Sequence, residues 1–316
     1  MKLLDILRFT RQHESKTEAL FINTYLLPKL NELGLEPTMD LEGNIWASNS
    51  PKAVSPYLFV AHIDTCHRQE GMTNPLVSSE GIISVNPDDL SKHCLGADDG
   101  VGIYANLRMI EAGVKGTFLF TRGEECGGIG ASYIAKSTPE MLEGFIMSVE
   151  VDRAGTDEVI CSQSYGECAS ESFSNELGLA IGMGHKASHE GVYTDVSEFA
   201  SIIPENVNIS AGYKWQHGPR EYVDSVYVET LIERLIAINW AALSIKRTPG
   251  DYGVENASWW DYNSYTSDYE RLIDYVTLHP SKVANFLDSC GIDEYEIERE
   301  WVGVEEDKDE LAVGLA

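Results

Sequence analysis

The sequence has little positive charge. Its 316 residues include 23 Lys and Arg against 51 Asp and Glu, which gives a formal net charge of −28. A nucleic-acid-binding surface needs a basic patch, and attraction to an anionic membrane surface needs clustered Lys and Arg. The composition therefore argues against nucleic-acid and membrane partners, and its plain consequence is solubility.

The sequence also lacks long apolar runs and paired cysteines. No run approaches the length of a membrane span, and residues 1–15 lack the uninterrupted apolar core of a signal peptide. The six cysteines form no Cys-x-x-Cys pair and no disulfide-framework spacing. We therefore expect a cytoplasmic protein with free thiols.

Apolar patterns of strand type alternate with patterns of helix type along the chain. Strands are expected at 45–47, 57–61, 82–85, 117–121, 145–151 and 158–162, and helices at 3–9, 18–33, 100–112, 130–136, 171–182 and 226–245. Because Pro204 interrupts 202–209, that run is expected to be at best an interrupted or edge strand. The alternation predicts an α/β fold with a mixed, mostly parallel sheet and helices on both faces.

The composition changes near Pro249. Residues 250–316 hold 17 Asp and Glu against four Lys and Arg, and aromatic residues cluster at 259–269. Acidic residues alone would indicate a solvated tail, whereas the aromatic cluster favours short helices that dock. We expect a catalytic domain at 1–248 and a small acidic helical appendage at 249–316.

Five short motifs place an imidazole or carboxylate at the end of an apolar run or at a turn. They are AHID (61–64), GADDG (96–100), RGEEC (122–126), VEVDR (149–153) and WQHG (215–218). Each alone has an ordinary explanation, such as a structural histidine, a helix cap or an exposed acidic turn. Together they supply two histidines and several carboxylates, roughly the ligand set that two divalent cations sharing one carboxylate require.

Three acids of these motifs are expected to have different roles. Metal-bound histidines usually donate their second ring N–H to a carboxylate, and Asp64 lies two residues after His62. Glu124 and Glu125 are adjacent and flanked by glycines, so one can bind metal while the other takes a proton from the attacking water.

With these motifs, the sequence resembles the zinc-dependent exopeptidases that use two co-catalytic metals, a group of aminopeptidases related to tripeptidases, carboxypeptidases and N-acyl amino acid deacylases. The resemblance covers about residues 3–246, including the segments DLEGNIWA (40–47) and NISAGYKWQHG (208–218). It does not cover the acidic C-terminal region.

The resemblance implies a role for each motif residue. The implied metal ligands are His62, Asp98, Glu125, Asp152 and His217. Asp98 resembles the ligand that bridges both ions, and the peptide after it is often cis in the family. Glu124 resembles the general base, and Asp64 the carboxylate that orients His62.

The spacings resemble those of the compact members of the family. Only 35 residues separate His62 from Asp98, and 64 separate Asp152 from His217. These intervals are too short for the inserted domains of the dimeric and shell-forming relatives. The chain therefore looks most like the compact bacterial aminopeptidases.

The resemblance implies hydrolysis of a peptide or small amide, with an aminopeptidase as the first choice. Asp195 is a weak candidate to hold the substrate ammonium group. N-acyl amino acid deacylase or carboxypeptidase chemistry at the same metals is the alternative, with Arg153 and Arg220 as candidates for a substrate carboxylate. A non-catalytic peptide-binding relative is a third interpretation. Nothing in the sequence indicates an oligomeric state.

Overall fold

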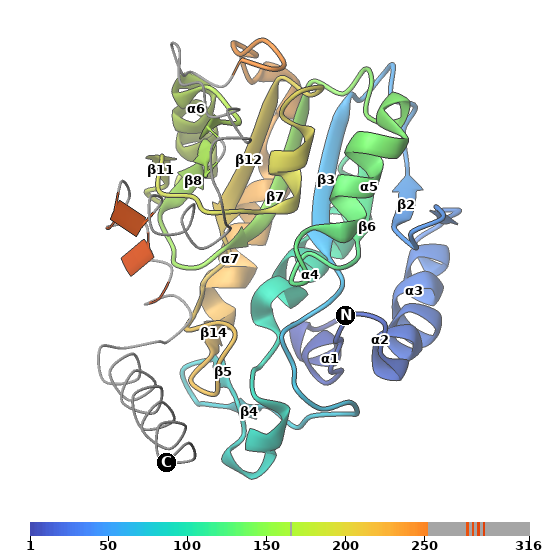
Figure 1. The fold of residues 1–316 in the computed structure, drawn as a ribbon, viewed down its shortest axis with the longest axis vertical. Helices are drawn as coiled ribbons and strands as arrows, with labels where there is room; N and C mark the ends of the chain where they lie inside the picture. The colour runs from blue at the N-terminus through green and yellow to red at the C-terminus, as the bar shows by residue number, and fades with distance from the viewer. Residues whose placement is uncertain (165, 252–275, 278–279, 281–282, 285–286, 288–316) are drawn as a thin grey trace, which may run out of the picture. The chain divides into compact units, whose positions relative to one another are not determined.

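The computed structural model describes residues 1–164, 166–251, 276–277, 280, 283–284 and 287 (Figure 1). The predicted acidic appendage at 249–316 lies almost entirely outside the described residues, so its helical character and its boundary stay predictions. Among the described residues, no helix is both long and apolar enough to cross a membrane.

An eight-stranded sheet forms the centre of the described chain (Figure 1). In spatial order its strands are β1 (Thr38–Met39), β2 (Ile45–Ser48), β6 (Thr117–Thr121), β3 (Tyr57–His62), β7 (Met147–Arg153), β12 (Glu205–Ser210), β8 (Glu158–Ile160) and β11 (Lys186–Ser188). Strands β6, β3, β7 and β12 are parallel to their neighbours in this central group, whereas β1–β2, β2–β6 and β12–β8 pair antiparallel. The predicted mixed, mostly parallel sheet is confirmed.

Helices cover both faces of this sheet. Alternate residues of β3 point to opposite faces: Phe59 and Ala61 belong to one apolar cluster, and Leu58 and Val60 to another. The first cluster includes side chains of α4 (Ala97–Glu111), α6 (Glu171–Ile181) and α7 (Ser225–Ala237). The second includes α5 (Ile129–Ser137) and the 3₁₀ segment η4 (Asp195–Phe199). Because both faces are buried, residues 58–61 of β3 and 118–120 of β6 are all apolar.

The N-terminal helical region packs on the first cluster. It comprises α1 (Leu3–Leu7), α2 (Lys16–Phe21), the π-helical segment η1 (Ile22–Leu26) and α3 (Leu27–Glu32). Ser15 caps α2 by accepting the backbone N–H of Glu18 at 3.0 Å. Pro28 lacks an N–H and stands in the first turn of α3, where the π-helical segment accommodates it within a continuous helical stretch.

Two smaller sheets and several short helices complete the described structure. An antiparallel sheet contains β13 (Tyr213–Lys214), β14 (Tyr222–Asp224), β5 (Ile82–Ser84) and β4 (Leu76–Val77), and β9 (Ser162–Gln163) pairs with β10 (Gly166–Glu167). The remaining 3₁₀ segments are η2 (Pro87–Lys92), η3 (Pro139–Met141) and η5 (Trp240–Ala242). The sheet that contains β13 and β14 holds the two ends of the loop that carries the WQHG motif.

The structure corrects two sequence-based expectations. Strand β12 is an interior strand between β7 and β8, because Pro204 directly precedes it and removes no hydrogen bond of its ladder. The last helix, expected over 226–245, ends at Ala237. The chain turns there because Trp240, which is 5% exposed, packs edge-on against the ring of Phe59 with centroids 5.0 Å apart.

Candidate metal centre

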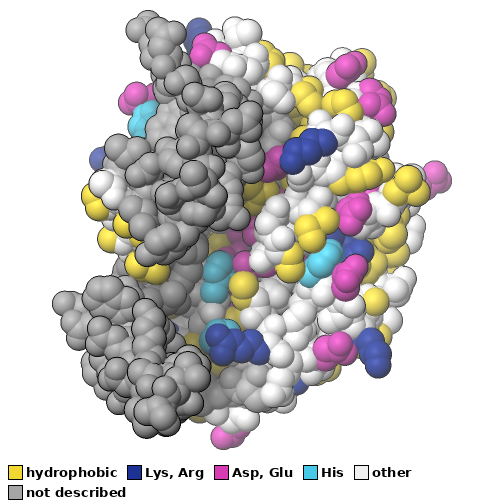
Figure 2. Space-filling view, in the orientation of Figure 1, with side chains coloured by type: hydrophobic (Ala, Val, Ile, Leu, Met, Phe, Trp, Pro, Cys, Tyr) yellow, Lys and Arg dark blue, Asp and Glu magenta, His cyan; other side chains and the backbone are white. Residues whose placement is uncertain are grey.

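The five motifs converge at one edge of the central sheet. His62 ends β3, Asp152 lies near the end of β7, and Glu124 follows β6. These three strands are parallel neighbours, so their carboxyl ends meet where ligands of α/β sheets usually bind. On the face drawn in Figure 2, histidine and acidic side chains gather near the middle of the molecule.

A first group of possible metal ligands is formed by His62, Asp98 and Asp152. The Nε2 atom of His62 lies 2.9 Å from Asp98 Oδ1 and 3.5 Å from Asp152 Oδ1. All three side chains are buried or nearly so. The resemblance implied that all three are metal ligands, and the structure places their donor atoms within reach of a single cation.

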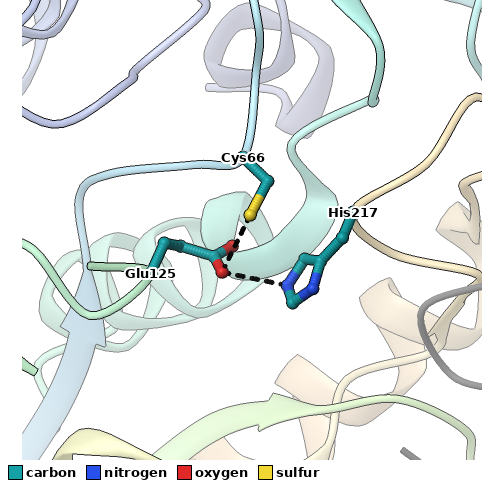
Figure 3. A group of neighbouring side chains, drawn as sticks. All are labelled: Cys66, Glu125 and His217. Atoms are coloured by element: carbon teal, nitrogen blue, oxygen red, sulfur yellow. Dashed lines mark hydrogen bonds and ion pairs between the residues drawn. The ribbon is translucent and has the colours of Figure 1, made fainter. Parts of the chain in front are cut away.

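A second group contains Glu125 and His217 together with a residue that the sequence analysis had not singled out, Cys66 (Figure 3). Glu125 Oε2 lies 3.0 Å from His217 Nε2 and 3.1 Å from the Cys66 sulfur. The φ angles of Trp215 and His217 are 56° and 62°, in the left-handed region that non-glycine residues rarely adopt. Backbone strain of this kind is concentrated at functional sites.

Asp98 connects the two groups. One carboxylate oxygen, Oδ1, faces His62 Nε2, and the other, Oδ2, lies 3.0 Å from His217 Nε2. The peptide bond between Asp98 and Asp99 is cis, as the resemblance implied. Asp99 turns away from the ligand groups: its carboxylate accepts the backbone N–H of Gly102 at 2.8 Å and that of His62 at 3.2 Å. One acid of the pair therefore faces the candidate site and the other fixes the helix and strand that flank it.

The Asp64 carboxylate contacts the RGEEC loop more closely than it contacts His62. The Nδ1 atom of His62 is 3.0 Å from the backbone carbonyl of Asp64 and 3.7 Å from its carboxylate. That carboxylate instead accepts the backbone N–H groups of Gly123, Glu124 and Glu125 at 2.8, 3.1 and 3.1 Å. The backbone carbonyl of Asp64 is therefore the group closest to the His62 ring and the one that orients it. The Asp64 carboxylate instead holds the turn that carries Glu124 and Glu125.

A second buried acid, Glu221, holds the GADDG turn in the same way. Its carboxylate accepts the backbone N–H groups of four consecutive residues, at 2.6, 3.0, 2.8 and 3.3 Å for Leu95, Gly96, Ala97 and Asp98. Glu221 is 1% exposed. Two carboxylates outside the ligand groups therefore fix the two turns from which Asp98 and Glu125 project.

Hydrogen bonds also fix Asp152. The hydroxyl of Tyr213 donates to Asp152 Oδ1 at 3.0 Å, and that of Thr194 donates to Asp152 Oδ2 at 3.1 Å. The backbone N–H of Asp152 donates to Asn208 Oδ1 at 2.8 Å. These contacts hold one carboxylate oxygen toward His62.

The crowding of buried acids changes their protonation. Burial raises the pKa of Asp152 to about 7, helped by the charge of Asp98. Burial also raises the pKa of Glu124 well above its usual value, and Glu125 and Asp152 add to the shift. For Asp98 burial acts in the same direction, but hydrogen bonds from His217 and His62 outweigh it and hold its pKa well below the usual range. The region has an excess of negative charge that a cation would relieve.

The donor atoms fit divalent cations. Imidazole, carboxylate and thiol are the groups that zinc accepts. Glu125 supplies an orphaned atom: its side chain is 7% exposed, and its Oε1 has no hydrogen-bond partner among the described residues. A buried carboxylate oxygen without a partner is rare in proteins unless an ion or water satisfies it.

The candidate substrate-binding residues lie in different surroundings. Asp195 is fully buried, and its Oδ2 accepts the hydroxyl of Thr121. Burial raises the pKa of Asp195 to about 7. Arg153 donates from Nε to Glu158 at 2.8 Å, and the guanidinium of Arg220 lies 5.5 Å from the centre of the Trp215 ring. Their roles in substrate binding stay predictions.

Sequence reasoning missed Cys66, Glu221 and Tyr213. A signal for Cys66 was present, because His62, Asp64 and Cys66 have the two-residue spacing that places side chains on one side of an extended segment. Tyr213 lies within the segment that carried the family resemblance. Glu221 gave no signal, because its partners are more than 120 residues away in the sequence.

Comparison with known proteins gives a structural likeness only. No family model and no curated protein matches the sequence. The fold is similar to that of a tripeptidase from Staphylococcus aureus, with a TM-score of 0.60 and 14% identity over 74% of this chain and 95% of that one. It is also similar to the aminopeptidase PepT from Bacillus cereus (TM-score 0.56, 14% identity, 74% and 95% covered) and to an aminopeptidase from the archaeon Desulfurococcus kamchatkensis (TM-score 0.53, 13% identity, 79% and 99% covered). The chain therefore has the fold of these exopeptidases, as the resemblance implied.

Proposed function

We propose that this chain is an aminopeptidase that hydrolyses peptide bonds with two divalent cations, zinc being the metal that its donor atoms suit best. The observation that carries the proposal is the position of Asp98, whose two carboxylate oxygens face two separate groups of donor atoms. A shared carboxylate of this kind is a feature of two-metal hydrolases. The exopeptidase fold of the chain agrees with the same chemistry.

The chain's own residues would hold the ions in two adjacent positions. The first would be bound by His62, Asp98 and Asp152, and the second by Asp98, Glu125 and His217. Bound there, the two ions would polarise the scissile carbonyl and lower the pKa of the attacking water.

Glu124 is the proposed general base. It lies in the same turn as Glu125 but belongs to neither ligand group. Burial raises its pKa, which makes its carboxylate a stronger proton acceptor than an ordinary glutamate. Glu124 takes a proton from the water as the water oxygen bonds to the carbonyl carbon. It then delivers that proton to the leaving nitrogen as the carbon–nitrogen bond breaks, which yields a free amine and a carboxylic acid that loses its remaining proton to solvent.

The charge of the site favours a substrate with a free amino group over one with a free carboxylate. Acidic residues predominate around the candidate site, and Arg153, one of the two candidates to bind a substrate carboxylate, is already paired with Glu158. A deacylase or carboxypeptidase would need a cation to bind the substrate carboxylate. We therefore place the aminopeptidase reaction first and keep these two as the alternatives.

Metal analysis combined with a substrate panel tests the proposal. The panel contains aminoacyl amides with a free α-amine, the same amides with an acetylated amine, and N-acyl amino acids. We expect metal-dependent cleavage of the free-amine substrates alone. Cleavage of the N-acyl amino acids alone would identify a deacylase or carboxypeptidase, and binding of the panel compounds without turnover would identify a non-catalytic relative.

A further inference from the structure

Cys66 stands at the second ligand group, and neither the motifs nor the resemblance gives it a role. It follows Asp64 by two residues, and in Figure 3 its sulfur and the ring of His217 both point toward the carboxylate of Glu125. The side chain is partly buried. A thiol in this position has two explanations: it donates a hydrogen bond to Glu125, or it binds the same cation as Glu125.

The distances agree with a shared cation. The donor atoms of Cys66, Glu125 and His217 all lie within 4.8 Å of one another. Around one tetrahedral zinc ion, with ligand bonds of about 2.0–2.3 Å, neighbouring donor atoms are about 3.3–3.6 Å apart. The sulfur is 3.1 Å from Glu125 Oε2, which is 3.0 Å from His217 Nε2, so each of these two distances is within a few tenths of an ångström of that separation.

The number of donor atoms also agrees. Glu125, His217 and the Oδ2 atom of Asp98 supply three donors, with Asp98 Oδ2 3.0 Å from His217 Nε2. Cys66 would supply the fourth donor from the protein, and zinc can take a further ligand, such as the attacking water, by expanding to five-coordinate. The orphaned Oε1 atom of the buried Glu125 is independent evidence that this carboxylate meets a partner other than protein.

We propose that Cys66 binds the second cation through its sulfur, as the fourth ligand beside Asp98, Glu125 and His217. The inference rests on the proposed function in one respect only, namely that a cation binds at Glu125 and His217. On binding, the S–H bond is replaced by a sulfur–metal bond, and the proton passes to solvent. No electron is transferred in this step.

The proposal makes the two cation positions chemically different. The first group offers one imidazole and two carboxylates, which also suit harder ions such as Mn²⁺. The second group would add a thiolate, a soft ligand that favours zinc and cobalt over manganese and magnesium. Metal selectivity would therefore reside in the second position, and Cys66 would determine it.

Cobalt substitution of the full-length chain tests this assignment without relying on turnover. Co²⁺ bound to a thiolate shows a sulfur-to-metal charge-transfer band in the near ultraviolet, and Co²⁺ bound to nitrogen and oxygen alone does not. The wild type is compared with Cys66→Ser and with Cys126→Ser. Cys126 is the matched control, because it is an exposed cysteine in the same loop as Glu125 and outside the ligand group.

We expect the band in the wild type and in Cys126→Ser, and its loss in Cys66→Ser. Zinc affinity of the second position should fall at least about tenfold in Cys66→Ser. Loss of a residue that only hydrogen-bonds to a metal ligand already lowers metal affinity about tenfold or more. The preference for zinc over manganese should shrink in the same variant.

A wild type that binds two cobalt ions without the band would overturn the role of Cys66 and leave the proposed function standing. A wild type that binds no metal would overturn both. Should Cys66→Ser fail to fold, the wild type alone still decides the matter by alkylation and mass spectrometry. Zinc should protect Cys66 from the alkylating reagent and leave Cys126 reactive, whereas equal reactivity of Cys66 with and without zinc would contradict the proposal.

Discussion

The carboxylate of Asp64 accepts the backbone N–H of Glu124 at 3.1 Å. This hydrogen bond ties the segment after β3, which carries His62, to the turn after β6, which carries the proposed base. Strands β3 and β6 are neighbours in the sheet, but Asp64 and Glu124 lie in the loops that follow them, which the sheet alone does not fix. A buried carboxylate that accepts several backbone N–H groups supplies this rigidity.

Replacing Glu124 and Glu125 in turn distinguishes the role of a general base from that of a metal ligand. Glu124→Gln should keep both cations and lose roughly 10²–10⁴-fold in kcat, the usual scale for removal of a general base. Glu125→Gln is the matched neighbour, and it should lose metal occupancy as well. Metal analysis and steady-state kinetics on both variants provide the test. Activity of Glu124→Gln close to that of the wild type would show that another group takes the proton.

Replacing Asp98 and His217 tests the bridging role. Asp98→Ala should weaken binding of both cations, because its two oxygens face the two ligand groups. His217→Ala should mainly weaken one. Elemental analysis of the purified variants gives the number of ions per chain. Two ions per chain in Asp98→Ala would exclude the bridge.

Glu221 offers a test of positioning. In Glu221→Gln the amide N–H₂ group faces backbone N–H groups that the carboxylate now satisfies, so at least one buried donor loses its acceptor. We expect a loss of about 1–3 kcal/mol in the free energy of unfolding, together with weaker metal binding through the displaced turn of Asp98. Glu233→Gln, on the exposed face of α7, is the control and should change neither.

Denaturant unfolding and metal titration of both variants give the measurement. A Glu221→Gln protein as stable as the wild type, with the same metal affinity, would show that the four hydrogen bonds are not needed to hold the turn.

The raised carboxyl pKa values predict how the metal-free fold responds to pH. Asp152, Asp195 and Glu221 have pKa values of about 7, mainly because they are buried. In the unfolded chain such groups titrate near about pH 4. Between these values the folded state binds more protons, so its stability is highest at low pH and falls as pH rises through 7. The pKa of Asp98 is shifted in the opposite direction, to below the usual carboxyl range. Its titration therefore affects stability only at a pH lower than this interval.

Thermal melts in the presence of a chelator should therefore give a lower Tm at about pH 8 than at about pH 5. Zinc should restore part of the stability at the higher pH, because it neutralises Asp152, the one of these three carboxylates that is a proposed metal ligand. Asp195→Asn removes one of the titrating groups and should reduce the difference. A metal-free Tm that stays level or rises over this interval would contradict the assigned pKa directions.

The sequence was sufficient to predict β2, β3, β6 and β7, because buried strands have a clear apolar pattern, and parallel strands that end at one edge bring His62 and Asp152 together. Asp98 joins them from the GADDG turn at the start of α4, a position that only the family resemblance implied. The sequence was insufficient where contacts between distant segments decide where a helix ends or what holds a turn. The last helix ends early because Trp240 packs against Phe59, which lies on the central strand β3. Glu221 reaches the GADDG turn across more than 120 residues. No local pattern indicates either contact.

Residues just after 248, the predicted end of the catalytic domain, still contact the described core. Contacts with the described core continue past the predicted boundary at residue 248: the backbone N–H of Gly250 donates to the carbonyl of Ala200 at 2.9 Å, and Arg247 Nε donates to that of Asp251 at 2.6 Å. Arg247 is 8% exposed, so these hydrogen bonds lie at a well-packed surface. A chain that ends at Asp251 should keep them, whereas a chain that ends at Arg247 should lose both.

We therefore expect the chain that ends at Asp251 to fold, to bind two cations and to cleave a small amide, since every proposed ligand and the base precede that point. The chain that ends at Arg247 should melt at a lower temperature, because the guanidinium of Arg247 loses one of its acceptors and the carbonyl of Ala200 loses one of its donors. Thermal melts, metal analysis and turnover of the two truncated chains and the full-length chain give the comparison. Should the chain that ends at Asp251 bind both ions and yet cleave no amide, residues after 251 would have to contribute to the active site.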